Sequence, residues 1–451
     1  MREDETGEQP VRVFTGSRIE PLDGTRPEAF AVRGERVAAT GSRAELADRF
    51  PAVERVDLDG ALVVPGFNDA HCHTSQAALA RVRVDVSDAR TADEVLAALR
   101  ARAALVPPGE WVVGQGLHED ALSGRVDRDL LDRASAEHPV VVIQYTFHRA
   151  VANTAALERI GYRTEADAPS GGQLLTTADG RLDGWMYERA WLDPWLPGSG
   201  RESIAPGGEP SAQLAALREV NTELHRLGIT SYCDAIVTPL EQEMYAAAHR
   251  LGQLTPRVSM LLWHSYFDPR AWPAEQPDAH RLQLAGVKLM LDGALSGGTC
   301  LCRQPYPSAT GGDNGLQVLD DAGFQRTVRS VHAAGARVAV HANGDLAITR
   351  CWMCWSRWST RRRGSGSTTG SNTAASRTRG SSNGSGRPVR PRSRSARSSR
   401  TSARPSNAST GLSGPPWPAP TSRCSTRGSR SRAPRTSPSS PSTRCRRSAA
   451  W

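Results

Sequence analysis

The chain is almost without lysine. Its 451 residues include 56 basic side chains, and only Lys288 among them is a lysine. The chain also lacks any run of about 18 apolar residues, so no segment is predicted to span a membrane. The first residues, MREDETGEQP, have no apolar core and do not resemble a secretory signal. Eight cysteines without regular spacing indicate reduced thiols. Together these features predict a cytoplasmic protein.

The last 101 residues, 351–451, lack aspartate, glutamate, lysine and histidine, and they contain one leucine and one valine. They hold 21 arginines, which leaves 35 basic and 47 acidic residues in the remainder, a net charge of −12. The overall charge of +9 therefore averages an acidic body and a basic tail. Because such a composition cannot bury a core, residues 351–451 are predicted to be a disordered Arg/Ser/Pro tail.

The residues before 351 have the pattern of a folded α/β protein. Short β-rich pieces such as EAFAVRGERVAATG predict a small β-sandwich segment over residues 1–64. Over residues 65–350, apolar runs such as PVVVIQYTFH alternate with amphipathic segments such as SAQLAALREVNTELHRLG. This alternation indicates a parallel sheet covered on both faces. We therefore predict a TIM-like (β/α)8 barrel, incomplete at its C-terminal strands, between the β-sandwich segment and the tail.

Side chains that can bind metals stand at the ends of the predicted strands. His71 and His73 form an HxH pair, and residues i and i+2 of a strand point the same way, so both imidazoles could reach one ion. Taken alone, HxH is equally well explained by a surface turn. His341 ends the run ARVAV, where it could be a ligand, a cap or an ordinary core histidine.

Lys288 lies inside the apolar run GVKLMLDGA. A buried lysine can lose its proton, which an arginine cannot do, and a primary amine is therefore indicated at this position. A deprotonated lysine can take up carbon dioxide as a carbamate that bridges two cations. A lysine that snorkels to the end of a barrel remains the simpler explanation when Lys288 is considered by itself.

Considered together, the four residues predict a binuclear metal centre. His71, His73, His341 and a carbamate on Lys288 could be shared by two divalent ions and a water of lowered pKa. This donor set suits zinc among several divalent ions, so two divalent ions, with zinc as the expected metal, are the predicted cofactors.

The segments VVPGFNDAHCH, GVKLMLDGALS and VAVHANGDLAI resemble signature segments of the metal-dependent amidohydrolase superfamily. The resemblance is to its amidohydrolase-3 branch of YtcJ-like and N-substituted formamide deformylase-like proteins, and it covers about residues 11–349. It implies that His71 and His73 bind one metal, that Lys288 is carboxylated and bridges, and that His341 binds the second metal. It also implies hydrolysis of a non-peptide C–N bond, in an amide, formamide or cyclic amide, by a hydroxide that the metals activate.

Four further residues are expected to line the pocket or to orient the ligands: His118, His148, Asp292 and Asp345. The resemblance also calls for a sixth-strand histidine and for an eighth-strand aspartate that serves as general base. No histidine follows His341 and no aspartate follows Asp345, so the general base is absent. The chain is therefore predicted to be an impaired enzyme.

The change of composition after residue 350 suggests a change of reading frame. Joining the third base of each codon to the first two bases of the next turns Cys351–Ser356 into Leu-Asp-Val-Leu followed by Glu or Val. The same shift makes Thr368–Thr373 compatible with His-Arg-Ile-Glu-His, and Trp417–Cys424 compatible with Ala-Gly-Ser-Asp-(Phe/Val)-Pro-Val. Our hypothesis is that a small insertion or deletion near codon 349 produced the tail.

The alternative is a non-catalytic remnant or binding protein whose tail has a function. The stretch RPVRPRSRSARSSR resembles an Arg/Ser-rich segment that binds nucleic acid. Almost no aromatic residues are interleaved there, and a binding function would not explain the shifted decoding, so nucleic acid is not expected. The expected partner is a small amide-type substrate, with no membrane, and a homo-oligomer is left open.

Overall fold

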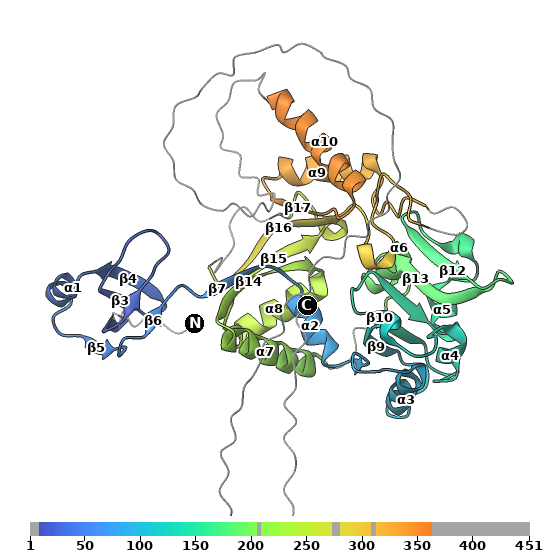
Figure 1. Cartoon of the computed structure of the whole chain (residues 1–451), viewed down its shortest axis with the longest axis horizontal. Coiled ribbons are helices and arrows are strands. Elements are labelled where there is room, and N and C mark those ends of the chain that lie inside the picture. The colour runs from blue at the N-terminus through green and yellow to red at the C-terminus, as the bar shows by residue number, and fades with distance from the viewer. Residues whose placement is uncertain (1–8, 205–208, 273–279, 308–312, 363–451) are drawn as a thin grey trace, which may run out of the picture. The chain divides into compact units, whose positions relative to one another are not determined.

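The computed structural model describes residues 9–204, 209–272, 280–307 and 313–362, and the side chains only as far as residue 356. The described residues belong to a compact unit that ends at Ser376. They form an N-terminal sheet, a mixed six-stranded sheet and a curved parallel sheet (Figure 1). The predicted α/β class is confirmed.

The N-terminal sheet has the strand order β4-β3-β1-β5, and a separate pair joins β2 to β6. Its core contains Val13, Ala31 and Leu46, which lies on a helix that begins with a Ser42 capping box. The bounds are β1 Val11–Thr15, β2 Arg18–Ile19, β3 Ala29–Arg33, β4 Arg36–Gly41, α1 Arg43–Arg49, β5 Glu54–Asp57 and β6 Leu62–Val63. This sheet lies in the segment predicted as a β-sandwich; a complete second layer stays a prediction.

The six-stranded sheet has the order β12-β13-β11-β10-β9-β8. Strands β8, β9 and β10 run parallel, whereas β10, β11, β13 and β12 pair antiparallel. The bounds are β8 Val84–Asp85, α3 Ala92–Ala103, β9 Val112–Leu117, η1 Glu119–Ala121, α4 Arg128–Asp132, β10 Val140–Gln144, β11 Arg149–Ala152, α5 Thr154–Ile160, η2 Glu165–Asp167, β12 Gly172–Thr176, β13 Leu182–Glu188 and α6 Arg189–Trp195. We call this part the inserted sheet, because it lies in the chain between the first two strands of the curved sheet.

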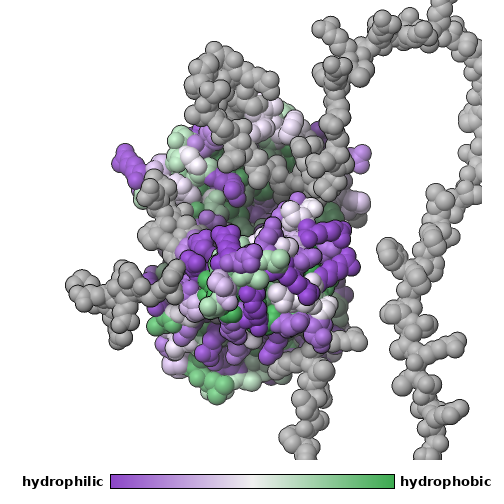
Figure 2. Space-filling view, turned by 90° about the vertical axis from the view of Figure 1, so that its left-hand side faces the viewer, coloured by the Kyte–Doolittle hydropathy of each residue, from purple (hydrophilic) through white to green (hydrophobic). Residues whose placement is uncertain are grey.

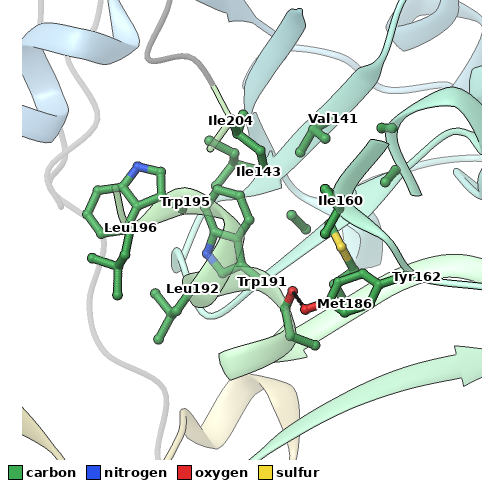
Figure 3. Close-up of a cluster of buried hydrophobic side chains, with 14 of the residues drawn as sticks. Val141, Ile143, Ile160, Tyr162, Met186, Trp191, Leu192, Trp195, Leu196 and Ile204 are labelled. Carbon is green, nitrogen blue, oxygen red and sulfur yellow. Dashed lines mark hydrogen bonds between the residues drawn. The ribbon is translucent and has the colours of Figure 1, made fainter. Parts of the chain in front are cut away.

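Buried aromatic side chains fix the inserted sheet to its helices. Trp191 and Trp195 of α6 pack with Ile143 of β10 and Met186 of β13 (Figure 3). Tyr162 is buried in the same cluster and donates its hydroxyl to the Ala190 carbonyl at 3.0 Å. A buried aromatic of this size removes a large apolar area from water, so the cluster holds the sheet as a rigid body.

The curved sheet contains five parallel strands in chain order, β7-β14-β15-β16-β17. Helices alternate with these strands, as the sequence pattern predicts. The bounds are β7 Phe67–Cys72, α2 Thr74–Ala80, α7 Pro210–Arg226, β14 Ile229–Val237, α8 Pro239–Arg250, β15 Arg257–Trp263, η3 His264–Tyr266, β16 Leu282–Met290, η4 Leu295–Gly297, α9 Asp321–Ala333, β17 Val338–His341 and α10 Asp345–Arg362. This sheet is half of the predicted barrel; a complete eight-stranded barrel stays a prediction.

One expectation within the barrel is wrong. The run Val140–Gln144 was expected to be a barrel strand, but it is β10 of the inserted sheet. The physical reason is that any strand buried on both faces shows the same continuous apolar run, so the run does not reveal its sheet.

The two outer strands of the curved sheet are its most exposed. No residue of β7 or β17 is fully buried, and Phe67 at the start of β7 is 63% exposed. Within the described residues β7 pairs only with β14 and β17 only with β16, so each has an open edge. Both edges are where further barrel strands would pair.

Helix α10 crosses the position at which the composition changes. Cys351 and Cys354 pack against the core cluster that includes Leu289 and Leu291, whereas Trp352 is 65% exposed. The remainder of the predicted tail, residues 363–451, lies outside the described residues.

The surface shows no extended apolar face in the view of Figure 2. Hydrophilic residues cover most of that face, and hydrophobic residues form small patches between them (Figure 2). Among the described helices, none has the length and apolarity needed to cross a membrane.

Candidate metal centre

The HxH pair lies where β7 passes into α2. His71 is the fifth residue of β7, and His73 occupies the N-cap position of α2. Their rings are 5.5 Å apart between centroids and nearly perpendicular, at 79°. Two imidazoles that bind one tetrahedral ion at about 2.1 Å have ring centres roughly 5 Å apart. The predicted pair therefore has the spacing of two ligands to one ion.

The surroundings of both histidines lower their pKa values, which favours the neutral form that binds metals. Burial lowers the pKa of His71, and Lys288 lowers it further. Burial, followed by His71, Lys288, His148 and His341, lowers the pKa of His73 to about 3. Part of the surface of each histidine is exposed to solvent.

Lys288 lies on β16, between the fully buried Val287 and Leu289, and is itself 3% exposed. In the register of the sheet it pairs with Trp263 on one side and Ala339 on the other. Burial lowers its pKa to about 8, and Cys233 opposes this shift. At pH 7.5 about a quarter of a lysine with that pKa is a free amine, compared with roughly 0.1% for an exposed lysine.

His341 ends β17 and is fixed by the loop after β16. Its Nε2 lies 3.0 Å from the Gly293 carbonyl oxygen and 3.1 Å from Nδ2 of Asn343. Burial lowers the pKa of His341 to about 4, with further lowering by His148 and Lys288.

Asp292 lies near His341 and bonds to the loops around it. Its carboxylate is fully buried and accepts three backbone N–H bonds, from Leu301 at 3.0 Å, Asn343 at 3.0 Å and Gly344 at 2.7 Å. It also lies 4.0 Å from Nε2 of His341. Asp292 therefore joins the loops that follow β16 and β17, and its role in orienting a ligand stays a prediction.

His148 belongs to the inserted sheet and lies beside His341. It lies between β10 and β11, and its ring centroid is 5.1 Å from that of His341, with the planes tilted by 42°. Its Nδ1 is 3.0 Å from Glu188 Oε2. Glu188 was missed by the sequence analysis, because an acid at the end of the run LDGWMYE has no spacing that relates it to His148.

The two remaining predicted residues lie apart from this group. His118 stacks on Tyr145, with ring centroids 4.1 Å apart, within the inserted sheet. Asp345 begins α10, is exposed and accepts the backbone N–H of Arg303 at 2.9 Å. Their recorded contacts are thus with neighbours other than the four predicted ligands.

The donor set fits divalent ions in its chemistry, because it offers neutral imidazoles and a lysine of lowered pKa. In the part of the chain that is described, no three His, Cys, Asp or Glu side chains form a group that could hold an ion. The histidines instead form two pairs, at 5.5 Å and 5.1 Å. A third donor for each pair would have to come from another kind of group, such as a modified Lys288.

Comparisons with known proteins agree with this arrangement. Residues 54–370 match the model of the amidohydrolase family, and residues 29–52 match an imidazolonepropionase-like composite domain of bacteria. The chain is 29% identical to a Bacillus subtilis protein named putative amidohydrolase YtcJ, over 73% of this chain and 62% of that protein. It is 27% identical to the N-substituted formamide deformylase of Arthrobacter pascens, over 71% of this chain and 60% of that protein. The chain thus spans about three fifths of the length of these curated relatives.

A solved structure shares the fold. The crystal structure of an uncharacterized metal-dependent hydrolase from Pyrococcus horikoshii superposes with a TM-score of 0.58 at 22% identity, covering 77% of this chain and 68% of that one. The match to the family extends over more than two thirds of the chain and confirms the predicted membership. The chain belongs to the amidohydrolase family.

Proposed function

We propose that this chain comes from a lineage of metal-dependent enzymes that hydrolyse the C–N bond of a small non-peptide amide, formamide or cyclic amide. The observation that carries the proposal is the pairing of the predicted histidines: the ring centroids of His71 and His73 are 5.5 Å apart, and His341 has a further histidine at 5.1 Å. The buried Lys288 lies on β16, which pairs with the strand that ends at His341. The relative that acts as an N-substituted formamide deformylase supports the substrate class.

Lys288 would supply the bridging ligand. The free amine adds to carbon dioxide and releases a proton, which gives a carbamate with two oxygen donors. The low pKa of Lys288 favours this step, because only the free amine is nucleophilic. Its place on β16 is supported by Val287 and Leu289, which are fully buried on either side. The carbamate oxygens would then be the third donor for each histidine pair.

Divalent ions bound there would provide a water of lowered pKa and polarise the substrate carbonyl. The chain's own residues would hold and orient these groups. His71 and His73 would take one position and His341 the other, and Asp292 would keep His341 in place through its bonds to the adjoining loop. Zinc is the metal that this donor set favours.

We infer that this chain is an impaired member of the lineage because of a frame change near codon 349. If the shift leaves the residue count unchanged, the shifted codons place leucine at positions 351 and 354 and aspartate at 352. Helix α10 supports this reading, since Cys351 and Cys354 pack against an apolar core and Trp352 is 65% exposed.

The test of this proposal has two stages. Sequencing the gene across codon 349 should reveal the insertion or deletion, and an unbroken frame in related genes through the same tail would refute it. The frame-restored protein should then bind about two divalent ions per chain and hydrolyse N-substituted formamides, whereas the present chain should show negligible turnover. A restored protein that binds two ions and hydrolyses no amide would refute the assigned reaction.

The missing strand-six histidine and strand-eight aspartate favour one alternative, a non-catalytic remnant. Metal stoichiometry separates the two, because a remnant would bind one weak ion or none. A filter-binding assay with the full chain at physiological salt tests for a nucleic-acid-binding tail.

A further inference from the structure

Glu188 is a buried carboxylate that the mechanism above does not use. It is fully buried at the end of β13, and its backbone has φ +48° and ψ −119°. Such a conformation is strained for a non-glycine residue, and a buried carboxylate adds a further cost. A residue with a strained backbone and a buried carboxylate is expected to position another group.

The carboxylate of Glu188 holds His148. Nδ1 of His148 lies 3.0 Å from Oε2 and 3.2 Å from Oε1. Thr299 donates its hydroxyl to Oε1 at 2.6 Å, which fixes the carboxylate from the other side. Since a carboxylate only accepts, Nδ1 carries the hydrogen, and in the neutral ring the lone pair is on Nε2.

Gly293 makes this arrangement possible. A Cβ at this position would lie 2.2 Å from Glu188 Oε1 and 2.2 Å from Thr299 Oγ1. The carbonyl oxygen of the same residue lies 3.0 Å from Nε2 of His341. Gly293 therefore leaves room for Glu188, which holds His148, and its own carbonyl contacts His341.

The rings of the two supported histidines lie close together. In the neutral ring the lone pair of His148 is on Nε2, and the ring centroids of His148 and His341 are 5.1 Å apart. Two imidazoles on one tetrahedral ion have centres roughly 5 Å apart. A histidine whose second nitrogen donates to a buried carboxylate is the usual form of a metal ligand, because the carboxylate fixes the ring and raises its basicity.

We propose that His148, positioned by Glu188, binds the same divalent ion as His341. The ion would then join the inserted sheet to the curved sheet, since His148 follows β10 and His341 ends β17. This proposal rests on the metal centre proposed above, but it does not depend on which substrate is hydrolysed.

The test uses the full chain, freed of metal and then titrated with Co²⁺. Bound cobalt is measured by equilibrium dialysis with elemental analysis and by its visible absorption. We compare wild type with His148→Gln, Glu188→Gln and His138→Gln. The last variant is the matched control, because His138 lies at the opposite end of β10 and bonds to Ser135. Far-ultraviolet circular dichroism verifies the fold of each variant.

We expect His148→Gln to lose about one of two ions and Glu188→Gln to weaken one ion by about 10- to 100-fold. His138→Gln should bind as wild type does. The proposal is overturned if His148→Gln and Glu188→Gln both bind two ions with unchanged affinity, or if wild type binds no cobalt. If His148→Gln does not fold, the Glu188→Gln titration decides alone, since that change preserves the side-chain shape.

The outcomes also separate this proposal from the proposed function. Loss of one ion in His148→Gln without any amide hydrolysis by the frame-restored protein would leave the ligand assignment intact and refute the reaction. Amide hydrolysis by the frame-restored protein, together with two bound ions in His148→Gln, would support the reaction and refute His148 as a ligand.

Discussion

Replacing Lys288 by methionine should stabilise the metal-free chain. Methionine keeps the length and the apolar stem of the side chain but has no charge, and the position is 3% exposed, so it suits a thioether. Burial lowers the pKa of Lys288 from 10.5 to about 8. A difference of this size corresponds to roughly 3 kcal/mol of lost stability for the protonated amine.

The sign of the pH dependence follows from this direction. Because the folded-state pKa is below the unfolded value, the unfolded chain binds more protons between about pH 8 and 10.5, and stability rises with pH across that window. Below about pH 8 the penalty is fully present. Lys288→Met should therefore gain about 3 kcal/mol at pH 7, and the gain should fade as the pH approaches 10.5.

The assay is urea denaturation of wild type and Lys288→Met at pH 7 and pH 10, in chelator and in buffer free of carbon dioxide. Lys288→Arg is the control, since it retains a cation that cannot lose its proton, and it should be less stable than wild type at both pH values. A Lys288→Met chain with unchanged stability at pH 7, or with the same gain at both pH values, would contradict the claim that an amine is kept in this apolar strand at a cost.

Three further predictions concern other parts of the structure. Burial raises the pKa of Asp234 to about 6, even though Tyr245 donates to its carboxylate at 2.7 Å, so the stability of the chain should fall as the pH rises from about 4 to 6. Asp234→Asn should flatten this slope in urea melts at pH 4 and pH 7, and an unchanged slope would refute the role of Asp234. Gly293→Ala should lower the affinity for Co²⁺ at least 10-fold, because its Cβ would displace Glu188, and wild-type affinity would show that this close approach is not needed. Phe67→Ser should change the stability of the present chain by less than about 0.5 kcal/mol, because Phe67 is 63% exposed. In the frame-restored chain the same change should cost roughly 2 kcal/mol if a further strand covers β7, and thermal melts of both chains would reveal the difference.

The sequence was informative where local chemistry decides the structure. His71, the sole lysine Lys288 and the strand-end His341 lie on strands of one parallel sheet, at β7, β16 and β17. His73 follows β7 directly, as the N-cap of α2. Their strand-end positions follow from short apolar runs that end in polar residues, a pattern that survives in a single sequence. The family resemblance rested on the same segments and was confirmed.

Tertiary placement was not predictable in this way. The run Val140–Gln144 reads as a buried strand whichever sheet it joins, so its place in the inserted sheet could not be deduced. Glu188 and His148 are separated by 40 residues, and their contact depends on the antiparallel pairing of β11 with β13. Asp345 follows the strand-end histidine closely in sequence, but it begins a helix and its recorded contacts are with Arg303 and not with the histidines.

The central claim is that Lys288 carries a carbamate between two ions, and isotope labelling tests it most directly. Because the chain contains one lysine, ¹³C NMR after exposure to ¹³CO₂ and zinc can report only this side chain or the N-terminal amine. We predict a single carbamate signal that persists after excess carbon dioxide is removed and that is absent from Lys288→Met. A folded, zinc-loaded wild-type chain with no such signal, or a signal that remains in Lys288→Met, would contradict the account.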